Sequence, residues 1–315
     1  MQKNSFSLLN GKILCNFVRK STFQDKMEPN KPTILVADSG STKTDWALAD
    51  VSGSPIQLFS TQGINPVHQT SEAIAETLSE AVQKVAVQPS MVFFYGAGIM
   101  AQNQPFMRSL LSSAFPIAEQ VCAESDLLGA ARALCRHSEG IACILGTGAN
   151  SCLYDGERIV QNTPPLGYIL GDEGSGAVLG RMFFNALFKG ALPEAMRDDY
   201  LRTTGLTYAD IIRRVYREPM ANRFLASTSL YISAHIADSP ELHQLVTDNF
   251  RQFLCRNVAP YRRLDLPVNA VGSMAWHYRE QLLAACHAEG FTLGTVVKSP
   301  IAGMMEYHVE LRIED

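Results

Sequence analysis

The stretch that decides the fold reads Ile34-Leu35-Val36-Ala37-Asp38-Ser39-Gly40-Ser41-Thr42-Lys43-Thr44-Asp45-Trp46-Ala47-Leu48-Ala49. Two apolar runs surround a turn of glycine, hydroxyl residues and lysine, which predicts a β-hairpin. The turn carries the backbone donors, hydroxyls and cation that a nucleotide's terminal phosphates require, at Gly40, Ser41, Thr42, Lys43 and Thr44. Asp38, at the end of the first run, is placed to hold a magnesium ion through water. A turn of this composition is also common in plain surface hairpins, so both interpretations stay open here.

The flanking strands distinguish this turn from the commoner phosphate loop. A P-loop needs an earlier glycine at a fixed distance before its Lys-Ser/Thr pair, and a helix after it. Here the pair Lys43-Thr44 runs into a second strand-like segment, residues 45 to 50. The sequence therefore predicts a phosphate-binding hairpin rather than a P-loop.

The same pattern occurs a second time. An apolar run at residues 141 to 145 leads into a turn, Gly146-Thr147-Gly148, and a second run follows at residues 152 to 154. Two such units about a hundred residues apart predict two similar α/β halves facing each other across a nucleotide cleft. A third junction, Gly272-Ser273, follows a strand at residues 267 to 271 and would let an adenine or ribose approach the backbone.

Alternating strand-like and helix-like segments predict an α/β fold from residue 33 onward. Strands are expected at residues 56 to 60, 91 to 95 and up to 124, and helices at 69 to 87 and 126 to 135. Residues 174 to 253 are expected to be largely helical, and a last helix from about residue 300 is expected to cross back to the first half. Leu230, Trp46 and Trp276 are expected in the core.

Composition bounds the function. The chain has 315 residues, 46% of them hydrophobic, and a net charge of -4 from 27 basic and 31 acidic residues. These charges are interspersed, which argues against nucleic-acid and membrane-surface partners. The seven cysteines are scattered without a close pair, which suits a reducing cytoplasm and argues against zinc or an iron–sulfur cluster.

The motifs together resemble a known family. The segment 38 to 44 looks like the first phosphate motif of the actin and sugar-kinase superfamily, Gly146-Thr147-Gly148 the second, and Gly272-Ser273 the adenosine motif. The segment 167 to 176 is similar to one in N-acetylglucosamine kinases, which belong to the BadF/BadG/BcrA/BcrD ATPase family. The resemblance implies two actin-like (ribonuclease H-like) domains, and ATP and Mg²⁺ as cofactors. One departure is Ala149, which stands where the family usually has serine.

The resemblance also implies site residues. Asp126 matches the catalytic aspartate, which would also contact the sugar, and Asn65 matches an asparagine that binds sugar hydroxyls. Asp172 matches a further sugar-binding carboxylate, within a substrate-binding segment that includes Gly167 and Tyr168. A homodimer is plausible from the resemblance alone.

Each of these residues also has a purely structural interpretation. Asp126 precedes an alanine-rich helix and could be its N-cap. Asp172 stands before another helix, where an acidic residue suits the helix dipole. Asn65 precedes Pro66 and by default would belong to a turn. Three glycines within six residues near Asp172 would weaken a helix, which favours close approach by a ligand there.

These observations predict an ATP-dependent kinase for an N-acetylated amino sugar, N-acetylglucosamine at its 6-hydroxyl being preferred. The alternative is an ATPase switch, such as an activator of a 2-hydroxyacyl-CoA dehydratase. The expected domains are residues 33 to 125 with 300 to 315, and residues 126 to 299. Residues 1 to 32 are expected to be a dispensable extension, and a start at Met27 is expected to leave an active protein.

Overall fold

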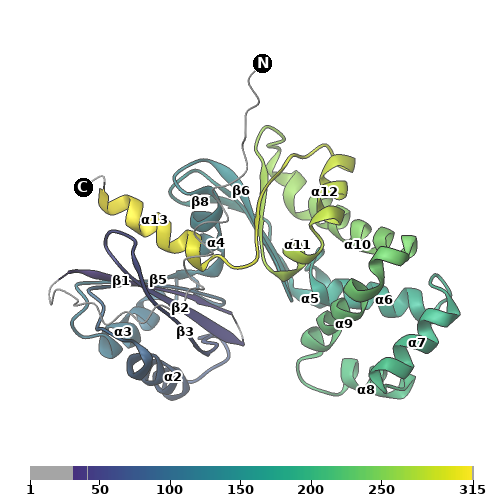
Figure 1. Cartoon of the computed structure of the whole chain (residues 1–315), viewed down its shortest axis with the longest axis horizontal. Coiled ribbons are helices and arrows are strands. Elements are labelled where there is room, and N and C mark those ends of the chain that lie inside the picture. The colour runs from purple at the N-terminus through teal and green to yellow at the C-terminus, as the bar shows by residue number, and fades with distance from the viewer. Residues whose placement is uncertain (1–30, 41, 314–315) are drawn as a thin grey trace.

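The computed structural model describes residues 31–40 and 42–313. Most of the proposed extension and Ser41 therefore lie outside the described residues. The architecture is α/β, with two five-stranded mixed sheets, as the sequence predicts. Figure 1 shows the sheets side by side, with helices on both of their faces.

The first sheet has the strand order β3-β2-β1-β4-β5. Its elements are β1 (Thr33–Ser39), β2 (Lys43–Asp50), β3 (Pro55–Gln62), α2 (Ser71–Lys84), β4 (Met91–Gly96), α3 (Gln104–Ala114) and β5 (Gln120–Ser125). The pair β1–β2 is the predicted hairpin, antiparallel from Thr33↔Asp50 to Ser39↔Thr44. Strands β4 and β5 lie parallel to β1, so all three end at one edge of the sheet.

The second sheet repeats this plan, with the order β10-β9-β6-β7-β8. Its strands are β6 (Gly140–Leu145), β7 (Ala149–Tyr154), β8 (Ile159–Asn162), β9 (Val268–Val271) and β10 (Leu293–Val297). The second hairpin, β6–β7, pairs Leu145 with Ala149, and β9 runs parallel to β6. Both sheets therefore begin with a hairpin and add parallel strands on the same side of it.

The region between β8 and β9 is helical, as predicted. It contains α5 (Gly167–Leu170), α6 (Gly176–Phe188), α7 (Glu194–Thr204), α8 (Tyr208–Tyr216), α9 (Ala221–His235), η1 (Ile236–Asp238), α10 (Pro240–Phe253), η2 (Leu254–Val258) and η3 (Ala259–Tyr261). The chain continues after β9 with α11 (Ser273–His277) and α12 (Arg279–Ala288). Apolar side chains of α6, α9, α10 and α12 form one core cluster with the second sheet.

Two helices lie between the sheets, α4 (Asp126–Cys135) and the final α13 (Ile301–Ile313). Helix α13 returns to the first sheet and covers it with Met304, Met305 and Val309, as predicted. Helix α4 packs on the second sheet and crosses α13 closely, since a Cβ added at Gly303 would lie 2.6 Å from the carbonyl oxygen of Ala133. Helix α4 thus contacts both halves, and the predicted domain boundary at residue 126 stays a prediction.

Two expectations about the core are wrong. Trp46 is fully buried, as expected, but Trp276 is 46% exposed and Leu230 is 77% exposed. Leu230 was expected in the core because it lies in an apolar helical pattern. Leu230 lies on α9 next to the buried Tyr231 and Ile232, and it faces away from them.

Candidate active site

The first turn is a tight hairpin whose buried hydroxyls are used inside the protein. The N–H of Gly40 donates to the carbonyl of Lys43 at 3.0 Å, which closes the turn. The hydroxyl of Thr44 lies 2.7 Å from that of Ser39 and donates to the carbonyl of Gln62. Thr44 can therefore offer a phosphate its main chain, but not a free hydroxyl.

The exposed part of the turn is polar and cationic. Gly40, Thr42 and Lys43 are exposed, and the Lys43 ammonium pairs with Asp45 at 2.6 Å. An exposed pair of this kind contributes little stability, so the lysine can exchange its partner for a phosphate at little cost. The predicted phosphate contacts at this turn stay predictions.

Ser39 joins the first turn to the loop that carries Asn65. Its hydroxyl accepts from the N–H of Ile64 and donates to the carbonyl of Ile64, both at 3.0 Å. Asn65 follows directly, and its Oδ1 accepts from the N–H of Val67 at 2.9 Å. This is the turn role that the sequence allowed for Asn65, but it uses only the side-chain oxygen. Among the described residues, the amide nitrogen has no hydrogen-bond partner.

Two carboxylates meet at the edge of the first sheet. Asp38 lies at the end of β1, and Asp126 follows Ser125, the last residue of β5. Burial raises the pKa of Asp38 to about 7, and the nearby charge of Asp126 adds to the shift. Burial also raises the pKa of Asp126, against the lowering effect of the Leu127 N–H. Crowded carboxylates of this kind favour a bound cation or a shared proton.

The N-cap interpretation of Asp126 does not describe the structure. Ser125 is the N-cap of α4, and its hydroxyl accepts from the N–H of Leu128 at 3.2 Å. Asp126 is the first helical residue, and its Oδ1 accepts from the neighbouring N–H of Leu127 at 2.8 Å. Because another residue caps the helix, the carboxylate of Asp126 is available for chemistry.

The second turn is built into the start of α6. The N–H of Gly176 donates to the carbonyl of Gly146 at 2.8 Å, and that of Ala177 to the carbonyl of Thr147 at 3.2 Å. Gly272 closes on the same turn from β9, where it adopts φ +123°. A Cβ at Gly272 would lie 2.3 Å from the carbonyl oxygen of Leu145, so only glycine fits. The turn Gly146 to Gly148 and the junction Gly272-Ser273 are therefore adjacent, as the predicted ATP site requires.

Asp172 lies beside this second turn. Its carboxylate would lie 3.3 Å from a Cβ at Gly148, and it accepts a hydrogen bond from the N–H of Ala149. Burial raises the pKa of Asp172 to about 6, and the charge of Glu173 adds to the shift. Asp172 has φ 56°, the left-handed conformation, which costs energy in most residues with a side chain and which aspartate adopts more readily than most. It is not a cap, because Ser175 caps α6.

The loop around Asp172 is held by a residue that sequence reasoning missed. Asn249 is fully buried on α10; its Oδ1 accepts from the N–H of Gly174 at 3.0 Å, and its Nδ2 donates to the carbonyl of Ser175 at 3.1 Å. The signal was present in the sequence. An asparagine interrupts the apolar face formed by Val246, Phe250 and Phe253.

Glu173 supports the loop from the other side. It is buried and pairs with Arg256 at 2.8 Å, and the Asn257 amide donates to it at 3.3 Å. Burial alone would raise the pKa of Glu173, but hydrogen bonds, including those from Arg256 and Asn257, hold it below its usual value. Glu173 is thus a structural anion.

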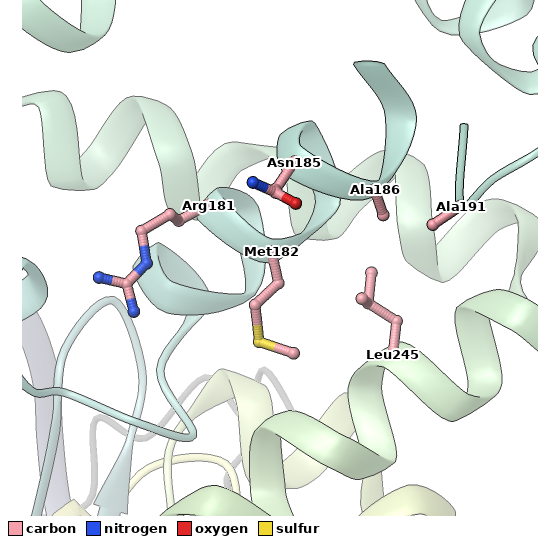
Figure 2. A pocket seen from close by; sticks show the side chains of 6 residues that line it. All are labelled: Arg181, Met182, Asn185, Ala186, Ala191 and Leu245. Atoms are coloured by element: carbon pink, nitrogen blue, oxygen red, sulfur yellow. The ribbon is translucent and has the colours of Figure 1, made fainter. Parts of the chain in front are cut away.

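The segment with Gly167 and Tyr168 is the short helix α5, and Arg181 of α6 reaches it. The Arg181 guanidinium donates to the carbonyls of Tyr168 and Ile169 at 3.4 and 3.3 Å. Arg181 also lines a hollow of about 360 Å³ between α6 and α10, with Leu245 at its opposite side (Figure 2). Sequence reasoning missed Arg181, which no motif marks. The hollow contains none of the predicted site residues.

Comparison with known proteins assigns the family. No protein-family model matches the chain, and none of the curated proteins matches it. A solved structure from Porphyromonas gingivalis, provisionally named an N-acetylglucosamine kinase, is 48% identical, with a TM-score of 0.85 over 89% of this chain and 99% of that one. The chain belongs to the N-acetylglucosamine kinase-like family.

Two more distant structures share the fold alone. A protein from Chromobacterium violaceum with the same provisional name is 19% identical, with a TM-score of 0.67 over 89% of this chain and all of that one. The ethanolamine utilization protein EutJ from Carboxydothermus hydrogenoformans is 12% identical, with a TM-score of 0.51 over 90% of each chain. Within the described part of this chain, no helix has the length and apolar character needed to cross a bilayer.

Proposed function

We propose that this protein is an ATP-dependent sugar kinase that transfers the γ-phosphoryl group to a hydroxyl of an N-acetylated amino sugar. N-Acetylglucosamine, phosphorylated at its 6-hydroxyl, is the proposed acceptor. The observation that carries the proposal is the meeting of Asp38 and Asp126 at the sheet edge beside the first turn. One carboxylate for a metal and one for a proton is what phosphoryl transfer to an alcohol requires.

Asp126 is the proposed base. The sugar hydroxyl oxygen attacks the γ-phosphorus, its proton passes to the Asp126 carboxylate, and the bond from the γ-phosphorus to the bridging oxygen breaks to release ADP. Its raised pKa makes Asp126 a stronger base than an exposed aspartate. The hydrogen bonds to its carboxylate come from backbone N–H groups, its own and that of Leu127, and a carboxylate has further lone pairs that can accept the proton.

Asp38 is the proposed magnesium residue. Burial, and after it the charge of Asp126, raises the pKa of Asp38 and so disfavours its ionised form, and a divalent cation relieves that cost. Magnesium, when bound, neutralises charge on the transferred phosphoryl group. Asp38 would hold it through water, while Lys43 and the two glycine turns hold the phosphates.

Asn65, Asp172 and the segment with Gly167 and Tyr168 are the proposed sugar contacts. The free amide nitrogen of Asn65 can donate to a sugar hydroxyl, and the strained Asp172 can accept from one. The 48% identity to a protein provisionally named an N-acetylglucosamine kinase supports an amino sugar as the acceptor. The alternative of an ATPase switch with an iron–sulfur cluster gains no support from the described cysteines, which are free and mostly buried.

A panel of sugars tests the proposal. ADP release is measured with ATP and Mg²⁺ in the presence of N-acetylglucosamine, N-acetylmannosamine, glucosamine, N-acetylmuramic acid or glucose, and without sugar. We expect release to depend on sugar and to be fastest with N-acetylglucosamine, with phosphate at its 6-oxygen by NMR. Equal release with and without every sugar would overturn the kinase assignment.

A further inference from the structure

Two large apolar side chains lie exposed near the second turn. Trp276 on α11 is 46% exposed and Leu230 on α9 is 77% exposed. Among the described residues, the Trp276 indole stacks on no other aromatic ring, and its N–H has no acceptor. An uncovered tryptophan ring offers a ligand a large flat apolar surface and an N–H donor.

Trp276 lies one helical turn from the residues that close on the second turn. The backbone N–H of Trp276 donates to the carbonyl of Gly272 at 3.0 Å. Gly272 itself lies against the backbone of Leu145 and Gly146. The neighbouring Met274 and Ala275 are buried against the sheet. Helix α11 exposes Ser273, Trp276 and His277, and of these Trp276 is the one with a large apolar ring beside the predicted nucleotide site.

Helix α9 reaches the same place from the other side. Ala226 lies against Gly176, since a Cβ there would approach the Ala226 Cβ to 3.1 Å, and Gly176 is bonded to the second turn. Farther along α9, the carbonyl of Ser229 accepts from the hydroxyl of Tyr278 at 2.6 Å. Leu230 follows Ser229, and Tyr278 follows Trp276 by two residues. The two exposed side chains thus belong to elements that are bonded together next to the turn.

We propose that Trp276 binds the adenine base of the nucleotide by stacking, with Leu230 as a second apolar contact. This proposal rests on the proposed kinase function, and it names the residue that makes the enzyme prefer a base-bearing phosphate donor. A purine ring on an indole removes apolar surface of both from water and aligns two flat π-systems. The phosphate turns hold the charge, and Trp276 holds the base.

Substitutions separate stacking from a structural role. Trp276→Ala is expected to raise the KM for ATP roughly tenfold or more, the scale measured for lost base stacking, with kcat at saturating ATP little changed. Trp276→Phe keeps a flat ring and is expected to retain most of the affinity. Leu230→Ala is expected to have a smaller effect of the same kind. Leu283→Ala is the matched control, because Leu283 on α12 is also 46% exposed.

Fluorescence tests the contact without turnover. The chain has two tryptophans, and Trp46 is buried and stacked on Phe59, so quenching by ADP in a Trp46→Phe variant reports Trp276. Tripolyphosphate, which has no base, is expected to bind without quenching. If ADP binds by calorimetry but does not quench, or if Trp276→Ala leaves the KM for ATP unchanged, the inference is wrong while the kinase function stands. If ADP quenches but no sugar is phosphorylated, the kinase function fails and the base site stands. If ADP does not bind at all, both fail.

Discussion

Asp38 near the end of β1 and Asp126 directly after β5 lie close enough that the charge of Asp126 adds to the burial that raises the pKa of Asp38 to about 7. The register of β1, β4 and β5 explains why the two carboxylates lie close together. Ser39 pairs with Gly96, and Gly96 pairs with Ser125, so the residues next to Ser39 and Ser125 share one sheet edge. Four predictions follow from this edge and the two turns.

Removing the proposed base is expected to abolish most turnover. Asp126→Asn keeps the size of the side chain and leaves the Ser125 cap in place, but it cannot take the hydroxyl proton. We expect kcat to fall roughly a hundredfold or more, with ADP affinity by calorimetry unchanged. Glu124→Gln is the control, because this carboxylate is engaged by the Gln104 amide at 2.7 Å. Normal turnover in Asp126→Asn would refute the assignment.

The ligand-free protein is expected to become less stable as the pH rises through the pKa of Asp38. An unfolded aspartate has a pKa near 3.9, against about 7 for Asp38 in the folded chain. Between these values the folded state binds more protons than the unfolded state, so the free energy of unfolding falls as pH rises. Asp172, with a pKa of about 6, adds a contribution of the same sign.

Asp38→Asn is therefore expected to raise Tm more at pH 8 than at pH 5, in thermal melts without nucleotide or metal, because only part of the proton-linked loss of stability has occurred at pH 5. Asp50→Asn is the matched control at the end of β2. Burial alone would raise the pKa of Asp50, but hydrogen bonds from Ser52 and Ser54 hold it below its usual value. Removing the Asp50 carboxylate is therefore expected to give no increase in Tm at pH 8. An Asp38→Asn protein that melts like the wild type at pH 8 would contradict the assigned electrostatics. In the wild type, added Mg²⁺ should reduce the difference between the Tm at pH 5 and the Tm at pH 8.

The sequence predicts the parts of this fold that depend on local pattern. Both hairpins, the order of strands and helices, and the residues 126 to 135 of α4 follow from apolar spacing and turn chemistry. The predicted site residues come from the phosphate motifs and from the family resemblance, and their roles stay predictions. The two glycine turns could be placed in advance because each lies between two apolar runs, a pattern that predicts a hairpin.

Local sequence pattern does not predict the features that depend on contacts between distant segments. Periodicity assigns Leu230 to the apolar face of its helix, but it cannot show which side of α9 the other helices cover, and the structure leaves Leu230 exposed while it buries Tyr231 and Ile232. The hydroxyl of Thr44 was assigned to phosphate, whereas Ser39 and Gln62, which only the folded sheet brings near, engage it. The support of Asp172 by Asn249 spans more than seventy residues, and only the single polar interruption on α10 hinted at it.

The amide nitrogen of Asn65 is expected to bind the sugar. Asn65→Asp keeps an oxygen for the Val67 N–H and therefore the turn, but it replaces the free donor with an acceptor. We expect a rise in the KM for sugar of roughly tenfold or more, with Tm and the KM for ATP unchanged. Asn65→Ala also loses the turn contact, so its Tm falls as well. If Asn65→Asp leaves the sugar KM at the wild-type value, Asn65 has only the turn role.

The contact between Gly272 and Leu145 is expected to set nucleotide affinity, because it fixes the adenosine junction against the second turn. A methyl group at Gly272 meets a carbonyl oxygen at 2.3 Å, and backbone cannot move aside as a flexible side chain can. Gly272→Ala should therefore push the turn outward, lower stability by about 1–3 kcal/mol and weaken ADP binding.

Gly190→Ala separates this clash from backbone strain. Gly190 also has a positive φ, +79°, but a Cβ there meets nothing within 4 Å, so only the strain of about 1–2 kcal/mol remains. Both variants should lose stability in urea unfolding, and only Gly272→Ala should lose ADP affinity in calorimetry. Equal ADP affinity in the two variants would mean that the junction and the second turn bind the nucleotide independently. In that case, their contact would serve the fold alone.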